Sequence, residues 1–228
     1  MKNILVIIRK QLADTFRNKT ILIQFILFPV LTVVMENAIH IEGMQEMFFT
    51  KLFAVMYIGM APLTATASII AEEKEKNTLR VLMMANVRPF EYLLGVGIYV
   101  WTLCMIGAMV MMMGVTQDRR PAFLGIMGIG FMISILAGAA IGTFARNLMM
   151  ATSLTMPIML ILAFAPMLAM FNDTIRKVAK IFYTLQLKEI LDGMNPREIS
   201  HASAMIIFAN AIVLLGAFIF AYQRKGLD

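Results

Sequence analysis

The stretch AEEKEKNTLRVLMMANVRPFEYLLG, residues 71–95, lies between two long apolar runs. It opens with five consecutive charged residues, 72–76, and runs through a short amphipathic segment to Pro89 and Glu91. The 228-residue chain around it is 60% hydrophobic and only 15% charged, whereas about a quarter of a soluble domain is charged. This composition predicts a polytopic membrane protein and makes the polar interruption the feature to explain.

The apolar runs predict six membrane-spanning helices. Each is about 20 residues long, which is the length that crosses roughly 30 Å of hydrocarbon. The expected fold class is therefore all-α, with residues 1–228 forming a single transmembrane domain. The predicted spans are residues 20–39, 51–71, 92–114, 122–145, 148–170 and 203–222.

Two flanking segments also have helical patterns. In residues 1–19, Leu5, Ile8 and Leu12 recur at helical spacing opposite basic residues, which predicts a helix in the headgroup plane. A plain anchoring helix is the alternative. Residues 171–202 predict one or two short helices at the outer leaflet, capped by Asn172 or Asp173, with a surface loop as the alternative.

The basic residues predict the orientation. The net charge is +6, and most Lys and Arg residues fall in segments that share a side with the N-terminus. Because cytoplasmic segments carry the excess of Lys and Arg, we expect both termini and residues 72–91 to face the cytosol. Because membrane orientation already explains the positive net charge, we expect no nucleic-acid partner.

Catalytic motifs are missing from the sequence. It has neither a Gly-rich phosphate loop nor a paired-histidine zinc motif, so we expect no catalytic residue, metal or cofactor on this chain. An intramembrane protease could use the Glu72–Glu73 pair, but it would need histidines at membrane depth. A secondary transporter would need more mid-membrane polarity than Gln24 provides. A structural or immunity-type membrane subunit remains an alternative.

The segment that follows the charged run predicts a short cytosolic helix over residues 78–86. Asn77 or Thr78 can cap it, and Pro89 disfavours helix at the residue before it. Such a helix suits docking into a groove on a partner, and a simple connecting loop is the alternative. Its expected apolar face is formed by Leu79, Leu82 and Met83.

Several residues of this region resemble the cytosolic signature of ABC-2 type transporter permeases. The N-terminal helix, the six predicted spans and the outer amphipathic segment follow in the order of that family. The chain differs from the family pattern at Asn77, where Gly is usual, at Asn86, where Pro is usual, and at Val96, where Lys is usual. The matching residues are Glu75, Thr78, Leu79, Leu82, Glu91, Leu94 and Gly95.

The resemblance implies a permease subunit of a bacterial ABC exporter in the cytoplasmic membrane. Two copies, or one copy and a sister permease, would assemble with two separate ATPase subunits, which bind ATP and Mg²⁺ in place of this chain. Helix 78–86 would be the coupling helix seated on an ATPase, and the helices within 173–199 would form an external gate. The residues assigned to ATPase coupling are Glu72, Glu73, Glu75, Asn77, Thr78, Leu79, Arg80, Leu82 and Met83.

Two further groups of residues are assigned within the predicted spans and the outer segment. Methionine surfaces adapt to varied apolar shapes, which favours an amphipathic peptide, toxin, drug or lipid-like cargo, although ordinary packing would use the same residues. The helix-packing group is Ser134, Gly138 and Gly142, small residues at every fourth position. The pore or gate candidates are Met56, Met60, Met156, Met159, Phe182 and Leu185.

Overall fold

The computed structural model describes the backbone of residues 2–17, 19–39, 46–85, 87–194 and 200–225. Within these ranges the chain is helical and contains no β-strand. The α-helices are α1 (Lys2–Arg17), α2 (Lys19–Ala38), α3 (Phe48–Glu75), α4 (Thr78–Met84), α5 (Pro89–Met111), α6 (Arg120–Phe144), α7 (Leu148–Leu168), α8 (Asp173–Ala179), α9 (Tyr183–Gly193) and α10 (His201–Lys225).

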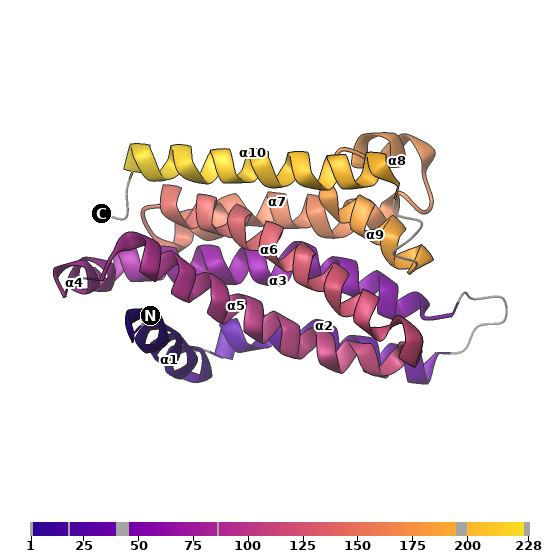
Figure 1. The fold of residues 1–228 in the computed structure, drawn as a ribbon, viewed down its shortest axis with the longest axis horizontal. Helices are drawn as coiled ribbons and strands as arrows, with labels where there is room; N and C mark the ends of the chain where they lie inside the picture. Colours follow the sequence, from indigo (N-terminus) through magenta and orange to yellow (C-terminus); the bar gives the residue numbers. More distant parts are fainter. Residues whose placement is uncertain (1, 18, 40–45, 86, 195–199, 226–228) are drawn as a thin grey trace.

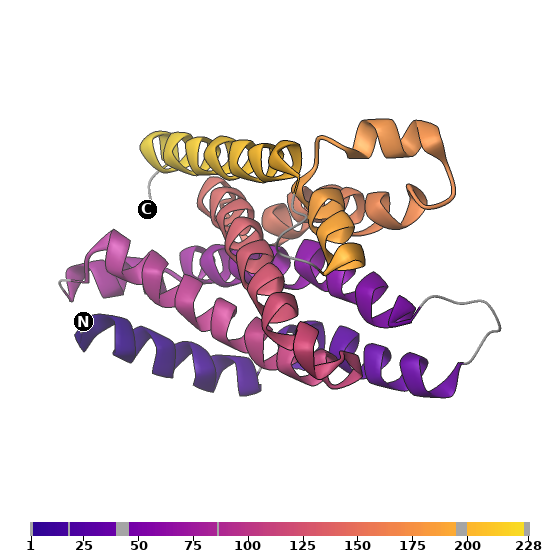
Figure 2. The same cartoon turned by 45° about the vertical axis from the view of Figure 1, so that its right-hand side comes forward.

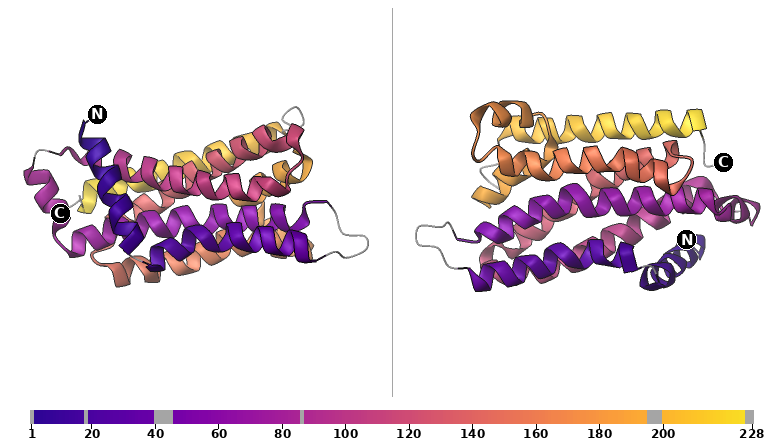
Figure 3. Two further views of the ribbon diagram at one scale, coloured as in Figure 1. Left: turned by 90° about the horizontal axis from the view of Figure 1, so that it is seen from below. Right: turned by 180° about the vertical axis from the view of Figure 1, so that it is seen from behind.

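The long helices form a bundle with two different ends (Figure 1). Helix α1, helix α4 and the C-terminal end of α10 lie at one end, and α8 and α9 lie at the other. Helix α1 crosses this first end obliquely rather than running along the bundle (Figure 3). The short helix α9 packs against α3, α6, α7 and α10 (Figure 2).

Five helical stretches in the described residues are long and apolar enough to cross a membrane. The expected count was six. The predicted span 20–39 corresponds to α2, but its described apolar part, Leu22–Ala38, is shorter than the other stretches. The five are Phe48–Glu75, Pro89–Gly114, Gln117–Phe144, Leu148–Leu168 and His201–Arg224.

Helix α3 is the centre of the bundle, and α6 packs against it through small residues. A Cβ added to Gly138 would lie 2.4 Å from the carbonyl oxygen of Leu63, and one added to Gly142 would lie 2.9 Å from that of Ala67. Only glycine therefore allows the two backbones to approach so closely. Ser134, one turn earlier, donates its hydroxyl proton to the carbonyl of Ile58 at 2.6 Å.

Helix α1 buries a different face from the one that its pattern predicts. Ile7 is the buried apolar residue and contacts α5 at Gly95. Leu5 and Leu12 of the predicted stripe are exposed, while Ile8 packs on the core. Packing against α5 determines which face of α1 is buried, and the spacing of residues within α1 does not reveal that packing. The exposed apolar residues of α1 are free to face lipid.

The segment after α7 forms two helices, α8 and α9, which is one of the two helical arrangements that the sequence predicts for residues 171–202. The chain turns at residues 180–182, so Val178 is exposed while Leu185 is buried. The predicted N-cap is confirmed, because Asn172 accepts hydrogen bonds from the amides of Thr174 and Ile175. The helix start expected at residues 195–198 lies outside the described residues.

Candidate functional site

The charged run at the C-terminal end of α3 is bonded to three other helices, and its most buried member is Glu73. One carboxylate oxygen of Glu73 lies 2.6 Å from the ammonium nitrogen of Lys10 and also accepts a hydrogen bond from the side-chain amide of Gln11. Glu73 and Gln11 are both buried. A buried carboxylate is stable only when it is paired and hydrogen-bonded, so Glu73 fastens α1 to α3.

The next two residues hold the turn between α6 and α7. Lys74 donates from its ammonium to the carbonyl of Thr143 at 2.8 Å, at the C-terminal end of α6. Glu75 accepts from the amide of Leu148 at 2.8 Å, at the first turn of α7. Both contacts complement the helix dipoles, with a cation at a C-terminus and an anion at an N-terminus.

Glu72 and Lys76 form the outward-facing pair of the charged run. Their side chains are 2.5 Å apart and one helical turn apart in sequence. The hydrogen bond to Glu72 raises the pKa of Lys76 above its ordinary value, so Lys76 stays protonated. Exposed pairs of this kind contribute little to stability.

Helix α4 continues from α3 after a single sharp turn. Asn77 has φ 54°, in the left-handed region that favours Gly and tolerates Asn. The hydroxyl of Thr78 donates to the carbonyl of Glu73 at 3.1 Å. Leu79 is buried and Leu82 packs against the core, so one side of α4 is anchored to the bundle.

The opposite side of α4 is exposed. Arg80, Val81 and Met84 all lie on the surface at this end of the molecule. The predicted docking face through Leu79 and Leu82 is therefore turned inward, because those two side chains complete the packing under the helix. The helix begins at the predicted residue but ends at Met84, and residue 86 lies outside the described residues.

Helix α5 begins at Pro89, two residues before Glu91. The Glu91 carboxylate accepts from the backbone amide of Arg88 at 3.0 Å. Proline at the first position and an acid at the third are favourable at a helix start. The connection from α3 to α5 is therefore fixed at both ends, with α4 held between them.

The pore and gate candidates differ in how far they are buried. Met56 and Leu185 are buried, Met60 and Met159 pack against the core, and Met156 is half exposed on α7. Helix α9 is held by a polar contact, since the hydroxyl of Tyr183 lies 2.7 Å from that of Ser134. Burial raises the pKa of Tyr183 above its usual range, so it remains a neutral phenol.

Among the described residues, no group of three or more His, Cys, Asp or Glu side chains is placed to hold a metal ion.

A family model described as "ABC-2 family transporter protein" matches residues 2–222, nearly the whole described chain. The chain belongs to the ABC-2 transporter family. It is thus a multi-pass membrane subunit of an ABC transporter, and such permeases normally work with ABC ATPase subunits. A search of curated proteins found no match.

From the sequence of this ABC-2 protein, Glu72, Glu73 and Glu75 of the charged run were assigned to ATPase coupling. In the structure all five residues of the run form hydrogen bonds or ion pairs within the chain. The sequence interpretation missed Lys10, Gln11 and Thr143 as their partners. The one available signal was a polar Lys10–Gln11 pair in an otherwise amphipathic helix, and it does not identify a contact 63 residues away.

Proposed function

We propose that this chain is the permease subunit of an ATP-driven exporter and that α4 transmits movement from a separate ATPase subunit. Two permease chains would form the translocation pathway, with both chain termini in the cytosol. The observation that carries the proposal is the two-sided character of α4. Leu79 anchors it to the bundle, while Arg80, Val81 and Met84 are exposed.

The bonds around α4 provide a route for such movement. Thr78 ties α4 to the end of α3, and that end is bonded to α1, α6 and α7. A displacement of α4 therefore acts on several helix ends together. Coupling of this kind needs contiguous packing and hydrogen bonds, and both are present between α4 and the bundle.

The cargo we propose is an amphipathic peptide, toxin, drug or lipid-like molecule. The support is chemical: the helices expose apolar and methionine side chains such as Met156 on α7, and methionine surfaces accept varied apolar shapes. The outer helix α9, held by Tyr183 and Ser134, would gate the outer end.

The proposal is tested with a charge on the exposed side of α4. Val81→Asp should abolish stimulation of ATP hydrolysis when the chain is purified with the ATPase subunit of its transporter, because the aspartate would lie in an apolar contact. Val178→Asp is the matched control, since Val178 is similarly exposed at the opposite end of the bundle (61% against 58%). Normal stimulation by a folded Val81→Asp chain would refute the coupling role.

A further inference from the structure

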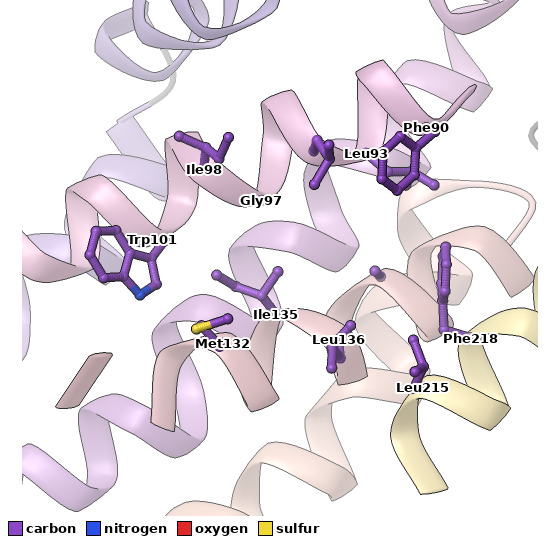
Figure 4. Close-up of a pocket in the computed structure, with 12 residues that line it drawn as sticks. Phe90, Leu93, Gly97, Ile98, Trp101, Met132, Ile135, Leu136, Leu215 and Phe218 are labelled. Carbon is purple, nitrogen blue, oxygen red and sulfur yellow. The ribbon is translucent and has the colours of Figure 1, made fainter. Parts of the chain in front are cut away.

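An apolar groove runs along the outside of the bundle between α5, α6 and α10. Its volume is about 420 Å³, which is within the range of small-molecule pockets. Phe90 and Phe218 lie at one end of it and Trp101 and Met132 lie toward the other (Figure 4). The side chains around it are apolar, so its occupant must present hydrocarbon.

The groove exists because small residues form its floor. Gly97 on α5 and Ala139 on α6 line it where larger side chains would fill it. A Cβ added to Gly97 would meet only Ile135, at 3.6 Å, which is an ordinary contact. The space beside Gly97 is therefore open and is not needed for the approach of two backbones.

The length of the groove matches one leaflet. Eleven residues separate Phe90 from Trp101 on α5, which is about 16 Å along a helix. Half of a hydrocarbon core roughly 30 Å thick is nearly the same length. The groove begins at the end of the bundle that carries α1 and α4, so it lies within the leaflet at that end.

The same end of each groove helix carries an exposed arginine. Arg88 immediately precedes α5, Arg146 follows α6 and Arg224 lies in the last turn of α10. The guanidinium of Arg224 is 5.8 Å from the ring centre of Phe220. The acids at this end include Glu91 and Glu75, whose carboxylates accept from the backbone amides of Arg88 and Leu148. The mouth of the groove is therefore basic.

We propose that the groove binds one acyl chain of an anionic phospholipid from this leaflet, with the headgroup at the arginines. An acyl chain satisfies the apolar lining and the one-leaflet length, and a negative headgroup satisfies the basic mouth. Basic residues near a membrane surface favour anionic lipids. The site is separate from α4 and does not depend on which cargo the protein moves.

Trp101 allows a direct test because it is the only tryptophan in the chain. Its indole nitrogen donates to the carbonyl of Gly128 at 3.1 Å, so the ring is fixed beside the groove. The full chain is reconstituted in vesicles of unlabelled phosphatidylcholine that contain a minor fraction of one brominated lipid. That lipid is either phosphatidylglycerol or phosphatidylcholine, and in both the bromines are at the middle of an acyl chain. Bound brominated chains quench the tryptophan fluorescence.

We expect brominated phosphatidylglycerol to quench Trp101 at a mole fraction more than about tenfold lower than brominated phosphatidylcholine. Each arginine should contribute roughly fivefold to this preference, so Arg88→Gln and Arg224→Gln should each reduce it by about that factor. Gly97→Leu should remove the preference, because leucine fills the groove. Gly125→Leu is the matched control, since a Cβ there meets nothing within 4 Å.

Equal quenching by the two lipids in the unaltered chain would overturn the proposal. So would a preference that survives Gly97→Leu. Absence of quenching by both lipids would mean that another copy or a partner protein covers the groove, and it would refute lipid binding. The arginine variants leave the groove interior untouched and keep the test valid if Gly97→Leu does not fold.

Discussion

Helices α3 and α10 are both apolar enough to cross a membrane, yet they occupy opposite environments. In α3, 78% of the spanning window is buried inside the protein, against 6% in α10. Helix α10 is nevertheless the more apolar of the two. In lipid the outermost helix must be apolar all round, while a central helix can carry polar groups that neighbouring helices satisfy. Hydropathy therefore ranks these helices in the opposite order to their burial.

The largest difference in stability should be found between a substitution that disturbs the packing of α3 and one on α10. Gly138→Leu on α6 would force a side chain into the backbone of α3 at Leu63, and overpacking of this kind costs roughly 3 kcal/mol. We expect loss of the monodisperse protein in detergent. Gly216→Leu on α10 is the control, because a Cβ there meets nothing within 4 Å. Equal stability of the two variants would contradict the central position of α3.

The next effect should come from the buried acid of α3. Glu73→Gln removes the charge that holds Lys10, and breaking a buried pair is strongly destabilising. Because Lys10 is 34% exposed and also lies near Asp14, we expect a loss of about 2 kcal/mol. Thermal unfolding of the purified chain measures it.

The control for that variant lies one residue earlier. Glu72→Gln removes an exposed pair with Lys76 and should change stability by less than about 0.5 kcal/mol. Similar losses for the two glutamates would mean that Glu73 is not the attachment point of α1.

The smallest effect should come from the polar contacts at and near α9. Ser134→Ala leaves the hydroxyl of Tyr183 without its partner, which should cost about 1 kcal/mol and speed amide exchange in α9. Asn210→Leu on α10 removes a contact to the carbonyl of Ile181 that is exposed, so amide exchange in α9 should change less. The reverse order would mean that α10, rather than the α3–α6 pair, holds α9.

Helix positions could be predicted because each depends on neighbouring residues. The apolar runs give the lengths of the long helices, Pro89 marks the start of α5, and Asn172 caps α8. The break between α8 and α9 was predictable only as one of two alternatives, since the sequence of residues 171–202 is compatible with either one or two short helices.

Contacts between distant residues were the part that sequence could not supply. Nothing local in the chain indicates that Glu73 faces Lys10, or that Leu79 points into the bundle while Val81 points out. A seven-residue helix with apolar residues on two sides has no unique docking face until its neighbours are placed. The groove beside Gly97 likewise requires the relative positions of three helices.

The backbone of Asn77 explains why this chain can lack the glycine usual in the family. The φ of 54° places this residue in the left-handed region, which asparagine adopts more readily than most residues other than glycine. One dihedral angle thus sets the direction in which α4 leaves α3. A β-branched residue there would disfavour the left-handed turn and change the direction of α4. Under the proposed coupling role, the assembled permease would then present α4 at the wrong angle to its ATPase subunit.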